Sequence, residues 1–203
     1  MKYLNILGIA VAAAVALMAF AASASATILE SNGVKTPSET TINSTLTGTA
    51  SLTTTSGTVL DTCTGGGVKG KTTNEGGEGV PVTGSVPPSG VTWTGCTKTT
   101  DTLEGGTLEI TWTAGINGTV TGKGFKVTVE MVKEFGGTCS YTLGGGTTLG
   151  EFKGTTAGDA TLAINAIVNG AAGNSFLCPS DTKWVANYKV TEPTPLAVTN
   201  KYP

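Results

Sequence analysis

The sequence predicts an all-β protein, a single two-sheet β-sandwich or jelly-roll-like domain of about nine or ten antiparallel strands with two disulfides. Three observations lead to this fold class. Apolar and polar residues alternate with a period of two in one segment after another, which is typical of strands with one buried face. Threonine, which is β-branched, fills many of the polar positions and suits the exposed side of a strand. Glycine clusters separate these segments, and helix-period patterns are nearly absent after residue 26.

Residues 1–26 are typical of a secretory signal peptide. Lys2 supplies a positive charge, residues 4–20 form an almost unbroken apolar run, and the small residues 22–26 offer a cleavage site. An uncleaved membrane anchor is the alternative, but no basic stop follows the run. We therefore expect cleavage after Ala26 and a secreted domain over residues 27–203. No long apolar stretch recurs in that domain, so we expect no membrane-spanning segment after cleavage.

The alternating segments follow one another along the domain. In the first, residues 41–54, the even positions from Ile42 to Leu52 are apolar or small and the odd positions are Thr, Asn or Ser. Further strands are expected in residues 91–95, 107–115, 124–132, 160–168, 183–190 and 195–199. The Gly- and Pro-rich region Thr64–Ser89 is predicted to be a long loop with one short strand at Val80–Val86.

The chain contains four cysteines, Cys63, Cys96, Cys139 and Cys178. An even number in an exported chain predicts disulfides, and three pairings are open. We favour Cys63–Cys96 with Cys139–Cys178, because each half of the domain then carries its own cross-link. Each would contribute ~3–4 kcal/mol by loop entropy. A metal site is disfavoured, because the chain has no C-x-x-C motif and no His.

The charged residues exclude several classes of function. The chain has a net charge of −2, with scattered Lys, no Arg and no His. A nucleic-acid-binding protein needs a basic face, so nucleic acid is not an expected partner. Without His, neither a Ser–His–Asp nor a Cys–His catalytic arrangement can form. We expect a protein that is not an enzyme and holds no cofactor.

Paired carboxylates are the remaining route to catalysis, as in glycosidases. The candidates are Glu75 with Glu78, Asp101 with Glu104, and Glu109 with Glu130. The first two pairs lie in glycine-rich segments and the third falls on outward strand positions. Surface charges that keep the protein soluble are the more ordinary explanation for all three.

Four aromatic residues are candidates for contact with a ligand: Trp93, Trp112, Trp184 and Tyr188. They occupy alternating strand positions, where they either line a groove for a hydrophobic or glycan ligand or belong to the core. The core is the commoner outcome for aromatic residues in such positions.

The order of the cysteine and aromatic motifs resembles the PraB-like family of small secreted bacterial proteins, described as protein activators of alkane oxidation. The likeness covers nearly the whole domain, and its most specific elements are "TCTGG…GCT", "G-T-C-x-Y" (Gly137, Thr138, Cys139, Tyr141) and "C-P…W-x-A-x-Y" (Cys178, Pro179, Trp184, Ala186, Tyr188). These motifs are structural and carry no catalytic residue. The resemblance implies an extracellular accessory protein of the cell surface or biofilm, in some members linked to growth on alkanes.

Two main hypotheses of function follow. The first is a non-enzymatic extracellular protein of the cell surface or biofilm matrix, which forms a homo-oligomer or filament by exchange of the segment Thr27–Thr54. Pairing of that segment within its own domain is the alternative. The second hypothesis is a secreted binding module for hydrophobic or glycan ligands, which predicts an aromatic-lined cleft. A carboxylate-dependent hydrolase is a third, weaker alternative.

Overall fold

The computed structural model describes residues 25–131 and 137–201, so all but the last two residues of the predicted signal peptide lie outside the described part. The all-β prediction is confirmed. The described residues form strands β1 to β16 and one short 3₁₀ turn, η1 (Pro88–Gly90), with no α-helix. Within these ranges, therefore, no helix has the length and apolar character to cross a membrane.

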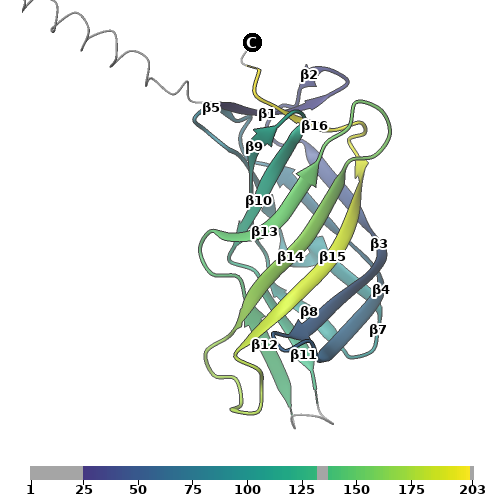
Figure 1. Ribbon diagram of the computed structural model, residues 1–203, viewed down its shortest axis with the longest axis vertical. Coiled ribbons are helices and arrows are strands. Elements are labelled where there is room, and N and C mark those ends of the chain that lie inside the picture. The colour runs from purple at the N-terminus through teal and green to yellow at the C-terminus, as the bar shows by residue number, and fades with distance from the viewer. Residues whose placement is uncertain (1–24, 132–136, 202–203) are drawn as a thin grey trace, which may run out of the picture.

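Eight strands close into a barrel (Figure 1). Each strand pairs antiparallel with the next around the wall, and the pairing of β13 with β14 closes the ring. In order around the wall they are β13 (Thr147–Lys153), β10 (Asn117–Lys123), β9 (Gly106–Ala114), β6 (Val82–Val86), β4 (Val59–Thr72), β3 (Thr41–Thr54), β15 (Asp181–Glu192) and β14 (Thr161–Gly170).

This closed ring differs from the two-sheet sandwich and the nine or ten strands that the sequence predicts. An alternating strand looks the same in a sandwich and in a barrel, because both bury one face of each strand. The difference lies in one long-range pairing, in which Gly150–Lys153 of β13 lie opposite Thr161–Ile164 of β14. Periodicity carries no information about which strands become neighbours.

A small four-stranded sheet covers one end of the barrel, at the top of Figure 1. It consists of β1 (Ala26–Ser31), β2 (Val34–Lys35), β5 (Gly77–Glu78) and β16 (Ala197–Thr199). Leu29 and Val198 of this cap, and Leu196 just before β16, are buried in the core. We call this the capped end of the barrel.

Four further strands extend the wall toward the opposite end: β7 (Val91–Cys96), β8 (Thr100–Glu104), β11 (Lys126–Glu130) and β12 (Thr138–Thr142). β7 pairs with β4, while β12, β11 and β8 continue outward from β14. β7 and β8 lie close together, joined by residues 97–99, yet no ladder connects them in the described sheet. At this end, β7 and β8 are therefore neighbouring edges of the described wall with no backbone pairing between them.

The glycine-rich segment 64–72 is part of β4, so the prediction of a long loop from Thr64 to Ser89 is wrong for its first third. The glycines serve close packing there. A Cβ at Gly66 would lie 2.2 Å from the carbonyl oxygen of Thr92 on β7, and one at Gly67 would lie 2.4 Å from that of Ser44 on β3. Any larger residue would force these backbones apart.

The inward face predicted for residues 160–168 and both disulfides are present. Ala160, Leu162, Ile164, Ala166 and Val168 are all buried, as their alternation predicts. In residues 41–54, by contrast, Gly48 of the predicted apolar face is exposed, because the register of β3 shifts around it. The favoured pairing is the one in the structure: Cys63–Cys96 joins β4 to β7, and Cys139–Cys178 joins β12 to the loop before β15. Both cross-links lie toward the end opposite the cap.

Candidate ligand-binding cavity

The barrel interior contains two adjoining cavities, each of about 80 Å³. The first, toward the uncapped end, is lined by Trp93, Trp184, Tyr141 and Tyr188 among mostly aliphatic neighbours, and we call it the aromatic cavity. The second reaches Leu29 and Leu196 of the cap, and we call it the capped cavity. Val68, Leu108 and Leu162 line both, so the two spaces are separated by side chains alone.

Three of the four aromatic residues that the sequence singles out meet in the aromatic cavity. Trp93 and Trp184 pack edge to face with ring centroids 6.4 Å apart, and Trp184 packs in the same way on Tyr188 at 6.5 Å. Trp184 and Tyr188 are four residues apart on β15, so they share its inner face. The three rings form a continuous apolar wall.

Trp112 is not part of this wall. It lies half-buried on β9, and its indole N–H donates a hydrogen bond to the carbonyl oxygen of Gly115 at 3.1 Å. Its backbone N–H donates to the Thr27 hydroxyl of β1 at 3.0 Å. Trp112 therefore helps attach the cap and serves as a natural control for the other two tryptophans.

Two tyrosine hydroxyls in the aromatic cavity have no acceptor for their hydrogen. Tyr141 is 2% exposed and Tyr188 is 0% exposed. Burial raises the pKa of each hydroxyl to about 12, while a hydrogen bond from the Trp93 indole N–H lowers the pKa of Tyr188. Both phenols are therefore neutral hydrogen-bond donors at ordinary pH.

Asp61 is a buried carboxylate at the edge of the aromatic cavity, only 3% exposed. Its Oδ1 accepts hydrogen bonds from the Thr62 N–H at 2.8 Å, the Thr97 hydroxyl at 2.7 Å and the Lys98 N–H at 2.9 Å. Its Oδ2 accepts from the Thr100 hydroxyl. Asp61 thus holds the 97–99 connection between β7 and β8 against β4.

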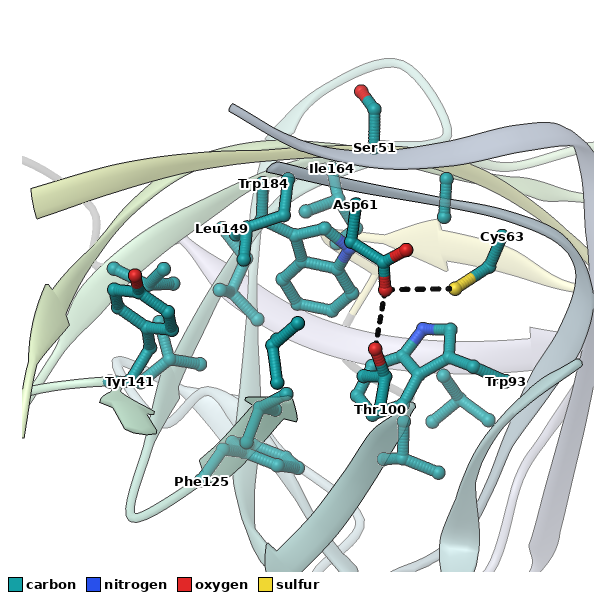
Figure 2. A pocket seen from close by; sticks show the side chains of 18 of the residues that line it. Ser51, Asp61, Cys63, Trp93, Thr100, Phe125, Tyr141, Leu149, Ile164 and Trp184 are labelled. Atoms are coloured by element: carbon teal, nitrogen blue, oxygen red, sulfur yellow. Dashed lines mark hydrogen bonds between the residues drawn. The ribbon is translucent and has the colours of Figure 1, made fainter. Parts of the chain in front are cut away.

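Figure 2 shows this arrangement, with Trp184 between Asp61 on one side and Tyr141 on the other. The dashed line from Asp61 to the Cys63 sulfur spans 3.8 Å. That sulfur is in a disulfide with Cys96 and carries no hydrogen, so we regard the approach as a van der Waals contact.

Asp61, Cys63 and Cys96 also place three ligand-type atoms within 4.8 Å of one another. Metals bind the thiolate form of cysteine. Both sulfurs here are oxidised, so the cluster does not fit a metal ion.

Of the carboxylates proposed from the sequence, those with described side chains (Glu75, Glu78, Glu104, Glu109 and Glu130) do not line either cavity, and the Asp101 side chain lies outside the described part. Glu75 forms an ion pair with Lys35 at 3.2 Å, and Glu104 forms one with Lys126 at 3.4 Å. Glu109 and Glu130 belong to β9 and β11, two strands that do not pair with each other.

Asp61 and Tyr141 are the cavity residues that sequence reasoning did not select as ligand-facing. Asp61 precedes Cys63 by two positions and so shares its inner face on β4, which is a usable signal. Tyr141 was noted only as a member of the family-like motif G-T-C-x-Y, two residues after Cys139. Its place in the cavity depends on the pairing of β12 with β11 and β14, which the sequence does not reveal.

Comparison of the chain with protein-family models, with curated proteins and with solved structures finds no match.

Proposed function

We propose that this protein is a non-enzymatic extracellular binding protein that holds a small, mainly apolar molecule inside its barrel. The observation that carries the proposal is the pair of adjoining interior cavities, one of them walled by Trp93, Trp184 and Tyr188. Eight-stranded barrels have an interior of the size that either fills with side chains or encloses one small ligand. Here the side chains leave space.

The size of the space limits the ligand. An engineered apolar cavity of about 150 Å³ binds benzene, so a cavity of about 80 Å³ suits a smaller or narrower molecule. A longer molecule would have to pass between Val68, Leu108 and Leu162 into the capped cavity. We therefore propose short or narrow hydrophobic ligands. A glycan has less support, because its many hydroxyls would meet a mostly apolar wall.

The non-enzymatic part of the proposal rests on the chemistry of the described residues around the cavity. Asp61 is the carboxylate in its lining, and that group already accepts four hydrogen bonds from the protein. The extracellular part rests on the signal-peptide pattern of residues 1–26 and on the two disulfides.

The resemblance to the PraB-like family adds a biological setting to this proposal. A protein that binds apolar molecules outside the cell fits the accessory role in alkane utilisation, and the cell-surface or biofilm association, that the resemblance implies. Self-association by exchange of Thr27–Thr54 has less support. β1 pairs with β16, β2 and β5, and β3 lies within the barrel wall between β4 and β15, all in one chain.

Tryptophan fluorescence tests the proposal. The oxidised protein beginning at Thr27 is titrated with n-alkanes from propane to n-decane and with benzene. We expect saturable changes in emission for the smaller ligands, strongly reduced in Trp184→Phe and retained in Trp112→Phe. Emission and calorimetric heats that stay flat for the whole panel would contradict a hydrophobic binding function.

A further inference from the structure

The hydroxyls of Tyr141 and Tyr188 bear on which ligand the aromatic cavity selects. Both side chains line the cavity, both are at least 98% buried, and neither hydroxyl has an acceptor for its hydrogen among the described residues, although the Trp93 indole N–H donates to the Tyr188 oxygen. Most buried polar side-chain atoms in folded proteins are hydrogen-bonded to protein or to ordered water. Two hydroxyl hydrogens without an acceptor in one cavity indicate that something entering the cavity supplies the missing partner.

The other residues of the aromatic cavity offer these hydroxyls few hydrogen-bond acceptors. Their surroundings in the cavity are mainly aliphatic, including Val127, Leu143 and Leu162. Asp61, the strongest acceptor in the lining, is already engaged by Thr100 and the 97–98 segment and lies on the far side of Trp184 from Tyr141 (Figure 2). The Tyr141 hydroxyl is therefore left to a ligand or to water.

The charges around the cavity restrict the kind of oxygen that can enter. No Lys is among the described residues that line it, and the chain has no Arg or His. Among the lining residues that the structure describes, Asp61 is the one with a charged side chain. A buried anion without a cationic partner is strongly disfavoured, and a second one near Asp61 more so. A ligand carboxylate is excluded on this ground, whereas a neutral oxygen is not.

The cavities also provide room for a hydrocarbon part. Tyr188 lies directly opposite Leu162 in the β14–β15 register, and Leu162 lines both cavities. An oxygen bound near Tyr188 therefore sits close to the boundary, from which an apolar chain can extend along Trp184 or toward the capped cavity.

From these observations we propose that the aromatic cavity selects small neutral molecules that carry one hydrogen-bond-accepting oxygen, such as a short alcohol or ketone, with Tyr141 and Tyr188 as the selecting residues. This inference rests on the proposed function and narrows its ligand class. A hydrocarbon leaves both hydroxyl hydrogens without an acceptor, and a carboxylate brings an uncompensated charge.

The test compares 1-butanol, 2-butanone, n-pentane and butanoate by calorimetry and by amide chemical shifts, on the wild type and on Tyr141→Phe/Tyr188→Phe. An alcohol and an alkane differ in the free energy of leaving water, so their affinities for one protein cannot be compared directly. The measured quantity is therefore the ratio of alcohol affinity to alkane affinity, compared between the two proteins. We expect the double substitution to lower this ratio about tenfold, with the loss of affinity falling on 1-butanol and 2-butanone. Butanoate should not bind the wild type, and Trp112→Phe should keep the wild-type ratio.

Both Tyr→Phe changes keep the ring and remove only a hydroxyl whose hydrogen has no acceptor, so the variant should fold, which a near-UV spectrum confirms. An unchanged ratio in the double variant would overturn the inference and would mean that water satisfies the hydroxyls. The proposed function would survive that result if n-pentane still bound. Absence of binding by all four compounds would overturn both.

Discussion

Trp93 and Trp184 meet edge to face inside the barrel, with ring centroids 6.4 Å apart and ring planes at 78°. They come from β7 and β15, which are separated in the wall by β4 and β3. Their contact therefore links two parts of the wall that share no backbone hydrogen bond. It also forms one face of the aromatic cavity, so the same pair contributes to stability and to the shape of the ligand space.

A double-mutant cycle measures this link. Trp93→Leu and Trp184→Leu, alone and combined, should give a coupling of about 0.5–1.5 kcal/mol in chemical denaturation, the range found for aromatic pairs. Trp112→Leu combined with Trp184→Leu is the control and should give additive losses, because Trp112 lies outside the cavity lining. Additivity in the Trp93–Trp184 cycle would show that the rings do not interact in solution.

Stability should fall at alkaline pH because of the two buried tyrosines. Burial raises the pKa of Tyr141 and Tyr188 from 10.0 to about 12 in the folded protein. Below pH 10 both states keep the protons and stability is fully present. As pH rises toward 12 the unfolded state alone releases them, so each tyrosine lowers the free energy of unfolding by about 1.4 kcal/mol per pH unit.

Denaturation from pH 8 to pH 11.5 checks this prediction. All other ionisable groups are common to the wild type and Tyr141→Phe/Tyr188→Phe, so the informative quantity is the difference between these two proteins. We expect the double variant to lose clearly less stability. Parallel curves for the two proteins would show that both hydroxyls ionise freely in the folded state.

Asp61 should be a major determinant of stability at the uncapped end. Asp61→Ala leaves four donors without an acceptor, so we expect a loss of roughly 3–5 kcal/mol in the free energy of unfolding. Asp61→Asn keeps one acceptor oxygen and should cost less. Asp181→Ala, at an exposed position on β15, should have almost no effect. Equal small losses for Asp61→Ala and Asp181→Ala would contradict this role.

The glycine run in β4 should not tolerate a side chain. Gly66→Ala would place a Cβ 2.2 Å from the Thr92 carbonyl oxygen, so we expect a loss of about 3 kcal/mol or more. Gly145→Ala is the matched control, because a Cβ there meets nothing within 4 Å, and its effect should stay within about 0.5 kcal/mol. Similar thermal midpoints for the two variants would show that β4 and β7 are not in close contact.

The strands and their buried faces were predictable from the sequence because each depends on local alternation. Leu162, Ile164 and Val168 are buried for the reason that their spacing indicates. Closure of the barrel was not predictable, since it depends on the pairing of β13 with β14, which the alternation within each strand does not encode. Glycines 65–67 led to the wrong prediction of a loop, because glycine occurs both in turns and where two strands approach closely. Only the positions of the neighbouring strands distinguish the two cases.

The candidate site was partly predictable. Trp93, Trp184 and Tyr188 occupy inward strand positions, so their selection required only the period of two. Their meeting, and the exclusion of Trp112, depends on where β7, β9 and β15 lie in the wall. Asp61 and Tyr141 are recognised as site residues only from their burial and hydrogen bonding, which no local sequence pattern reveals.

Crystallography under xenon pressure reveals whether the barrel encloses apolar space, because xenon enters apolar cavities without needing a specific contact. We expect a xenon atom in the aromatic cavity beside Trp93, Trp184 and Tyr188, with weaker occupancy in the capped cavity. Xenon confined to the outer surface, with side chains filling the barrel interior, would contradict this expectation.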